Sequence, residues 1–171
     1  MITISTKGMN DGKYEIDFSV PSVEVEELPE EFVEEVAISG NLTKIGKRYN
    51  FEGSVTCNAT LVCDRSLEEY EEMISNDLKW TCLEDSDIYR EKIDDEYIPG
   101  ELYALEEDHS IDITKEVIEQ LIVAIPMKKV APAYRGKDIE EIYPEHSAGN
   151  EKSDGNEIDN RWSKLKKIKF N

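Results

Sequence analysis

The chain of 171 residues has little of what usually identifies a catalytic or metal-binding protein. Its three cysteines, Cys57, Cys63 and Cys82, form no Cys-x-x-Cys pair, and their odd number disfavours a disulfide framework. A zinc knuckle is disfavoured as well, since neither of the two histidines has a partner at zinc-ligand spacing. The nine glycines never cluster, so phosphate-cradling glycine loops are absent. We therefore expect no cofactor and no stoichiometric zinc.

Long apolar runs and targeting segments are also missing. The longest run without a polar residue inside the strong helical pattern, Leu121–Ile125, is far too short to span a bilayer. The first eleven residues lack the basic region and apolar stretch of a secretory signal. Together with the cysteine usage, these absences predict a soluble, reduced, cytoplasmic protein that does not act at a membrane.

Basic residues are scarce and unevenly placed. The chain holds 20 lysines and arginines against 39 aspartates and glutamates, but residues 161–171 carry five basic residues and no acidic one. The rest of the chain therefore has 15 basic residues against 39 acidic ones, a net charge of −24. Such a surface repels phosphate backbones and attracts basic proteins. We expect no DNA binding and a basic partner.

The clearest strand is predicted at Tyr49–Cys63, where apolar and polar residues alternate over the whole segment. A period of two sustained this long is typical of an antiparallel strand with one face on a core. Alternation at Val36–Leu42 predicts a second strand, joined through a turn in which Gly46 can take a positive φ. A third strand follows within Leu67–Leu83, and the three segments predict an antiparallel meander.

The hydrophobic period then changes from two to that of a helix. Seven apolar residues recur at helical spacing between Ile111 and Ile125, and Asp112 or Thr114 is available as N-cap. Pro126 should end the helix just before it. Strands followed by a covering helix make an α+β domain, and we place this domain at residues 1–133, with an antiparallel β meander covered by one main helix.

Two acidic stretches interrupt this pattern. A run with seven glutamates between Glu24 and Glu35 is typical of a solvated loop or face. The stretch Glu84–His109 is acidic and contains Pro99-Gly100, which predicts a loop with short strands.

The carboxy-terminal part is predicted to be a flexible acidic and polar linker over residues 134–159 and a short basic helix over residues 160–171. Two interpretations of this tail stay open. It contacts RNA or the ribosome, with Trp162 stacking on a base, or it docks its apolar stripe on the domain while its lysines meet the acidic body. The candidate partner-binding residues of the tail are Arg161, Trp162, Lys164, Leu165 and Lys167.

Cys63 and Arg65 are the other candidate partner-binding residues. Cys63 next to a cation could form a reactive thiolate, but a buried cysteine at a strand end, with Arg65 shaping the turn, is the alternative that we favour. Both histidines, His109 and His146, lie in acidic, polar stretches, which disfavours a Cys/His catalytic pair.

Three segments in order resemble the YceD family, the proteins required for accumulation of large-subunit ribosomal RNA. Cys63-Asp64-Arg65-Ser66-Leu67 is similar to the family's Cys-x-Arg-Cys-Leu. Ile111–Val117, continued to Leu121 and Ile125-Pro126, is similar to its Asp-Leu-x-Glu…Leu-x-Leu-Pro helix. The third segment, Asp159-Asn160-Arg161-Trp162 with Leu165, is similar to its closing Asp-Pro-Arg-x-x-x-Leu.

The resemblance implies a non-enzymatic role in large-subunit ribosome biogenesis and 23S ribosomal RNA accumulation. In many bacteria such genes neighbour one for a small basic zinc-ribbon protein of the large subunit, and an acidic body suits such a partner. The chain departs from the family at Ser66, where many members have a second cysteine, and in residues 132–159, which contain no cysteine. A zinc site implied by the family is therefore lost. A general protein-interaction module and a Cys63-dependent enzyme are the alternative functions.

Overall fold

The computed structural model describes residues 1–92, 98–137 and 141. The chain divides into two compact units, Met1–Val130 and Ala131–Asn171. The predicted linker, at residues 134–159, and the tail, at residues 160–171, fall almost entirely outside the described residues, so both stay predictions.

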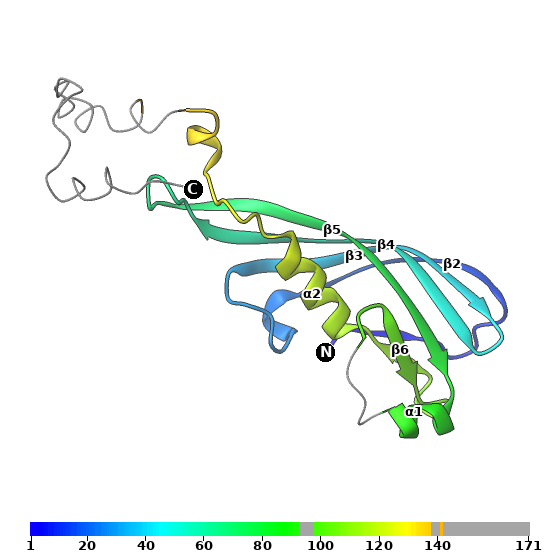
Figure 1. The fold of residues 1–171 in the computed structure, drawn as a ribbon. Helices are drawn as coiled ribbons and strands as arrows, with labels where there is room; N and C mark the ends of the chain where they lie inside the picture. Colours follow the sequence, from blue (N-terminus) through cyan, green and yellow to red (C-terminus); the bar gives the residue numbers. More distant parts are fainter. Residues whose placement is uncertain (93–97, 138–140, 142–171) are drawn as a thin grey trace, which may run out of the picture. The chain divides into compact units, whose positions relative to one another are not determined.

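The first unit is an α+β fold built on a five-stranded sheet of order β2-β3-β4-β5-β6 (Figure 1). Its strands β3, β4 and β5 form the three-stranded antiparallel meander that the sequence predicts, and β2 extends it, with a short 3-10 turn, η1, between β2 and β3. The fifth strand, β6, pairs parallel to β5, so the sheet is mixed rather than a pure meander. The strands and η1 are β2 (Gly12–Pro21), η1 (Ser22–Glu24), β3 (Phe32–Ile45), β4 (Arg48–Val62), β5 (Glu69–Glu84) and β6 (Glu101–Ala104).

Strand β4 has the predicted buried face. Tyr49, Phe51, Val55 and Leu61 are all buried there, whereas Glu52, on the other face, is exposed. The strand is joined to β3 by a turn in which Gly46 has a φ of 59°, as predicted. The alternation in sequence therefore determines which side of the sheet becomes the core.

Helix α2 (Thr114–Ala124) covers the inner face of the sheet, packing on β5 and on β4. Its apolar stripe is buried at Val117 and Leu121, and the amide of Asn76 on β5 donates to the backbone oxygen of Gln120 at 3.1 Å. The helix ends at Ala124, just before the segment with Pro126, as predicted.

The predicted N-cap of α2 is wrong. Ile113 occupies that position and has no side-chain cap, although Asp112, the residue before it, accepts the N–H of the first helical residue. Asp112 accepts the backbone N–H of Thr114 at 2.9 Å, and the Thr114 hydroxyl accepts the N–H of Ile2 at 2.7 Å. The bond from Ile2 attaches the start of the helix to the amino-terminal residues.

A two-stranded sheet beside the main one pairs β1 (Thr3–Ser5) with β7 (Ser110–Asp112), with Ile4 opposite Ile111. Between β5 and β7 the sequence predicts a loop with short strands, and β6 confirms such a strand. The same stretch also contains a helix that was not predicted, α1 (Ser86–Lys92). No residue of α1 is buried, so this helix has no apolar stripe that the sequence could have shown.

The described part of the second unit contains a 3-10 turn, η2 (Pro132–Tyr134), and the Lys137 ammonium 5.9 Å from the centre of the Tyr134 ring. None of the helices that the structure describes is both long and apolar enough to cross a membrane.

Candidate functional site

The first candidate site is the turn between β4 and β5, which holds Cys63 and Arg65. The Cys63 side chain is fully buried, its N–H donates to the Glu68 oxygen at 2.9 Å, and its own oxygen accepts the N–H of Leu67 at the same distance. Arg65 is half-buried, and Leu67, at a φ of 60°, is exposed. The buried Cys63 side chain adds no exposed surface to this turn, and its part in partner binding stays a prediction.

Asp64 connects this turn to the segment that follows α2. Its N–H donates to the Lys129 oxygen at 2.7 Å, and its carboxylate accepts the Lys129 N–H at 2.7 Å. The two hydrogen bonds join residues 65 positions apart in sequence. Asp64, in the first segment of the resemblance, therefore contacts the chain three residues beyond Pro126, where the second segment ends.

The other candidate residues of the site, Arg161, Trp162, Lys164, Leu165 and Lys167, lie outside the described residues. The structure therefore brings Cys63 and Arg65 together on one turn and leaves the tail residues untested.

Two of the three buried cysteines, Cys57 and Cys82, are held in their neutral thiol form. Burial raises the pKa of Cys82 from 9.0 to about 12, with a further contribution from the charge of Glu84. Burial, aided by the charge of Glu34, also raises the pKa of Cys57. A thiol kept protonated by its surroundings is a poor nucleophile. Among the described residues, no group of three His, Cys, Asp or Glu side chains is placed to hold a metal ion.

The second candidate site is the acidic segment between β2 and β3. All seven glutamates between Glu24 and Glu35 are exposed, and the sequence has no lysine or arginine from Tyr14 to Thr43. Within the described part of the chain, none of the seven carboxylates forms an ion pair; Lys47 and Arg90, for example, pair with acidic residues elsewhere. Among the described residues, no lysine or arginine therefore compensates the negative charge of this segment, and the Met1 ammonium donates to the backbone oxygen of Glu24 at 3.1 Å.

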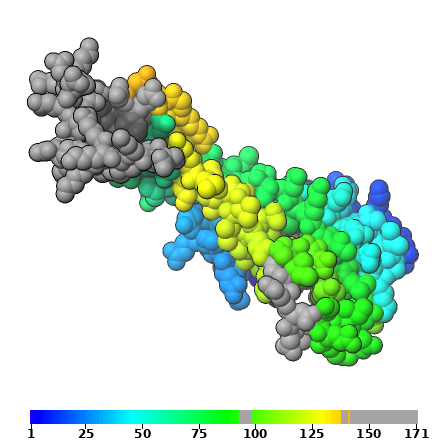
Figure 2. Space-filling model, viewed as in Figure 1, coloured from blue at the N-terminus to red at the C-terminus, as the bar shows by residue number. Residues whose placement is uncertain are grey.

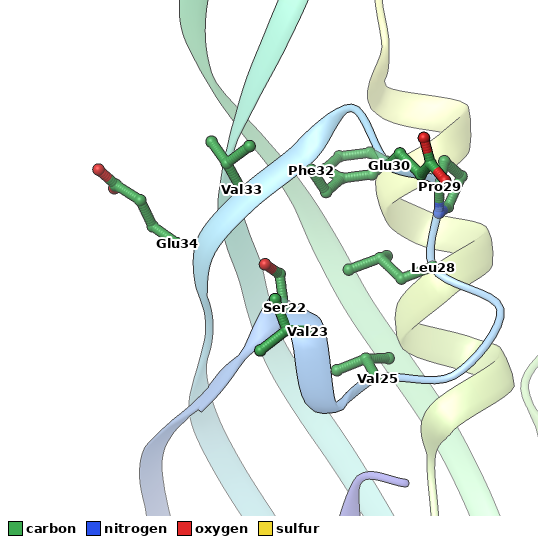
Figure 3. A pocket seen from close by; sticks show the side chains of 9 residues that line it. All are labelled: Ser22, Val23, Val25, Leu28, Pro29, Glu30, Phe32, Val33 and Glu34. Atoms are coloured by element: carbon green, nitrogen blue, oxygen red, sulfur yellow. The ribbon is translucent and has the colours of Figure 1, made fainter.

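An apolar cavity opens within the same segment. It has a volume of about 410 Å³ and is lined by residues of η1, the following loop and the start of β3 (Figure 3). Figure 3 shows Leu28 pointing into the space between Phe32 and Val23, with the carboxylates of Glu30 and Glu34 on opposite sides. The loop stands out from the surface beside α2 (Figure 2). We call this cavity with its glutamates the acidic groove; its lining residues are Ser22, Val23, Val25, Leu28, Pro29, Glu30, Phe32, Val33 and Glu34.

A β-bulge positions one wall of the acidic groove. The register of β3 against β4 shifts between Val33 and Ala37, and Glu34 within the shift has a φ of 64°. The amide of Asn58 donates to the Glu34 carboxylate at 2.6 Å and fixes its direction. Strand β2 pairs with β3 only from Glu35 onward, so in the described structure β2 leaves the start of β3 uncovered.

The sequence analysis missed this groove because it treated the glutamate run as solvated loop. The signal was present in the apolar residues placed among the glutamates, Val25, Leu28 and Phe32, of which Val25 and Phe32 are buried. A purely solvated loop has no need of such residues.

A family model described as large ribosomal RNA subunit accumulation protein YceD matches residues 51–169. The chain belongs to the YceD family. No curated protein and no solved structure matches it. The YceD match begins within β4 and includes the Cys63 turn, Asp64 and α2, whereas the acidic groove precedes it in sequence. The predicted family resemblance is therefore confirmed, and the groove is a feature of this chain outside the matched segment.

Proposed function

We propose that this YceD-family protein is a non-enzymatic factor in large ribosomal subunit biogenesis that binds a basic ribosomal protein or an assembly intermediate carrying one. The family name supplies the ribosomal context. The observation that carries the choice of partner is the set of seven glutamates between Glu24 and Glu35, which are exposed and form no ion pair among the described residues.

Electrostatics supports a protein partner over bare RNA for this part of the chain. Carboxylates attract lysine and arginine side chains and repel phosphates, and an uncompensated cluster also accelerates encounter with a basic partner. Ribosomal RNA contact, if made, is assigned in this proposal to the basic residues 161–171.

A catalytic role finds little support in the chemistry of the described residues. The Cys63 thiol is fully buried and so lacks the accessible surroundings of reactive cysteines. A Cys63→Ser variant should therefore restore normal 23S ribosomal RNA levels in cells that lack the protein. Loss of that rescue by a folded Cys63→Ser protein would favour the enzyme.

Capture from cell lysate tests the proposal directly. The tagged full chain, at low salt, should retain at least one basic large-subunit protein, with or without ribosomal RNA. Binding should weaken as salt rises, because exposed charges are screened beyond about 10 Å at 0.1 M. Capture of proteins unconnected to ribosomes, and of no ribosomal component, would instead support a general protein-interaction module.

A further inference from the structure

Resting on the proposed function, we propose that the acidic groove is the binding site for a basic peptide segment of the partner that carries at least one apolar side chain. The apolar side chain occupies the cavity, and neighbouring lysines or arginines lie against the glutamates around it. The inference therefore specifies where the partner binds and what its binding segment contains.

The cavity supplies the apolar half of this site. Its volume of about 410 Å³ is at the lower end of the roughly 300–1,000 Å³ of ligand pockets, which suits one or two side chains rather than a folded domain. Val23, on its lining, is 92% exposed, so an occupant would remove this side chain from water. Val25 and Phe32 are already buried and give the cavity a firm apolar floor.

The glutamates supply the polar half. Glu30 and Glu34 lie at opposite sides of the cavity (Figure 3), with the Glu34 carboxylate directed outward, so the surface around the cavity is negatively charged on both sides. The Asn58 hydrogen bond holds Glu34 in place, which lowers the entropy lost when it pairs with a cation. This charge complementarity favours a basic segment over an acidic or a purely apolar one.

Placement in the fold also favours a peptide. The loop protrudes beside α2 (Figure 2), and the start of β3 is flanked by η1 and not paired with β2, so a peptide can approach the groove from the loop side. A phosphate or nucleotide is disfavoured, since the groove lining contains no lysine or arginine to neutralise it.

Fluorescence anisotropy with labelled synthetic peptides tests the inference on the full chain. The probe is a seven-residue peptide of lysines with two leucines, and its matched control has serine in place of each leucine. The lysine–leucine peptide should bind about tenfold more tightly than the lysine–serine peptide, because only leucine fills the cavity.

Two groove variants with matched controls locate the binding. The groove triple variant combines Glu30→Gln, Glu31→Gln and Glu34→Gln, and it should weaken binding of the lysine–leucine peptide about tenfold. The control triple variant removes three exposed charges elsewhere through Glu15→Gln, Glu71→Gln and Asp77→Asn. It should change the affinity for this peptide less than about twofold. Val23→Asn should weaken the same peptide, and Met73→Asn, at another exposed apolar residue, should not. Val23 and Met73 are both exposed, so both single variants are expected to fold, and circular dichroism checks this.

If the groove triple variant and the control triple variant weakened peptide binding equally, the peptide would be attracted by the acidic surface in general. That result would overturn the groove as the binding site. Unchanged binding by the groove variants would overturn it as well. Tighter binding by the groove variants would also contradict the proposal, because it would mean that a segment of this chain occupies the groove. None of these results depends on capture from lysate, so failure of the groove and failure of the proposed function are separable.

Discussion

Gly40 and Gly53 lie opposite each other on β3 and β4, so close that a Cβ on Gly40 would lie 2.5 Å from the Cα of Gly53. A Cβ on either glycine would also lie 2.8 Å from the tip of the Phe51 ring. That ring stacks on Trp80 of β5 with the ring centres 5.3 Å apart. The two glycines therefore leave the space in which this aromatic pair packs.

Gly53→Ala is accordingly expected to destabilise the protein by about 1–3 kcal/mol or more, as overpacking does. Urea unfolding gives the free energy. Glu52→Ala, one residue earlier and exposed on the outer face, is the control and should stay within about 0.5 kcal/mol of wild type. An equally stable Gly53→Ala protein would show that the sheet can open at this point.

Leu121→Ala should cost roughly 2–5 kcal/mol, because Leu121 is fully buried between α2 and the sheet. Val123→Ala is a suitable control on the same helix, since Val123 is 75% exposed. A loss below about 0.5 kcal/mol for Leu121→Ala would mean that the helix does not cover the sheet as described.

Asp64→Ala should destabilise the connection between the Cys63 turn and the segment after α2. Losing the carboxylate bond to the Lys129 N–H should cost about 0.5–1.5 kcal/mol, whereas Asp64→Asn keeps an acceptor and should cost less. Hydrogen exchange at the Lys129 amide gives the local readout. Unchanged protection of this amide in Asp64→Ala would contradict the contact.

Alkaline pH should destabilise the fold through its buried thiols. A pKa raised in the folded protein means that the unfolded chain loses its proton first as the pH rises, so the stability contributed is complete below pH 9.0 and is lost towards about pH 12 for Cys82. Burial raises the pKa of Cys57 in the same direction. Unfolding free energies at about pH 8 and about pH 10 should therefore differ, and the difference should shrink in Cys82→Ala. A pH-independent stability over this range would contradict the burial of the thiols.

The sequence predicted the parts of the fold whose signal is local. Strand β4 shows its period of two directly, and Pro126 fixes the end of α2. The parallel pairing of β6 with β5 and the pairing of β1 with β7 depend on residues far apart in the chain, and no local pattern encodes them.

The candidate sites show the same division. Burial of Cys63 follows from its place at the end of an alternating strand, but its connection to Lys129 through Asp64 required the three-dimensional fold. The acidic groove also depends on a bulge at Glu34. Glu34 has a left-handed backbone conformation there, which is uncommon outside glycine and cannot be predicted from the residue type alone.

Association with large-subunit precursors is the central claim, and gradient sedimentation of cell lysate tests it most directly. At low salt, part of the full-length protein should migrate with precursors of the large subunit and should leave them as salt is raised. The groove triple of glutamine substitutions should shift the protein towards the top of the gradient, whereas the control triple should not. Migration of the full-length protein only at the top of the gradient, at every salt concentration, would contradict the account.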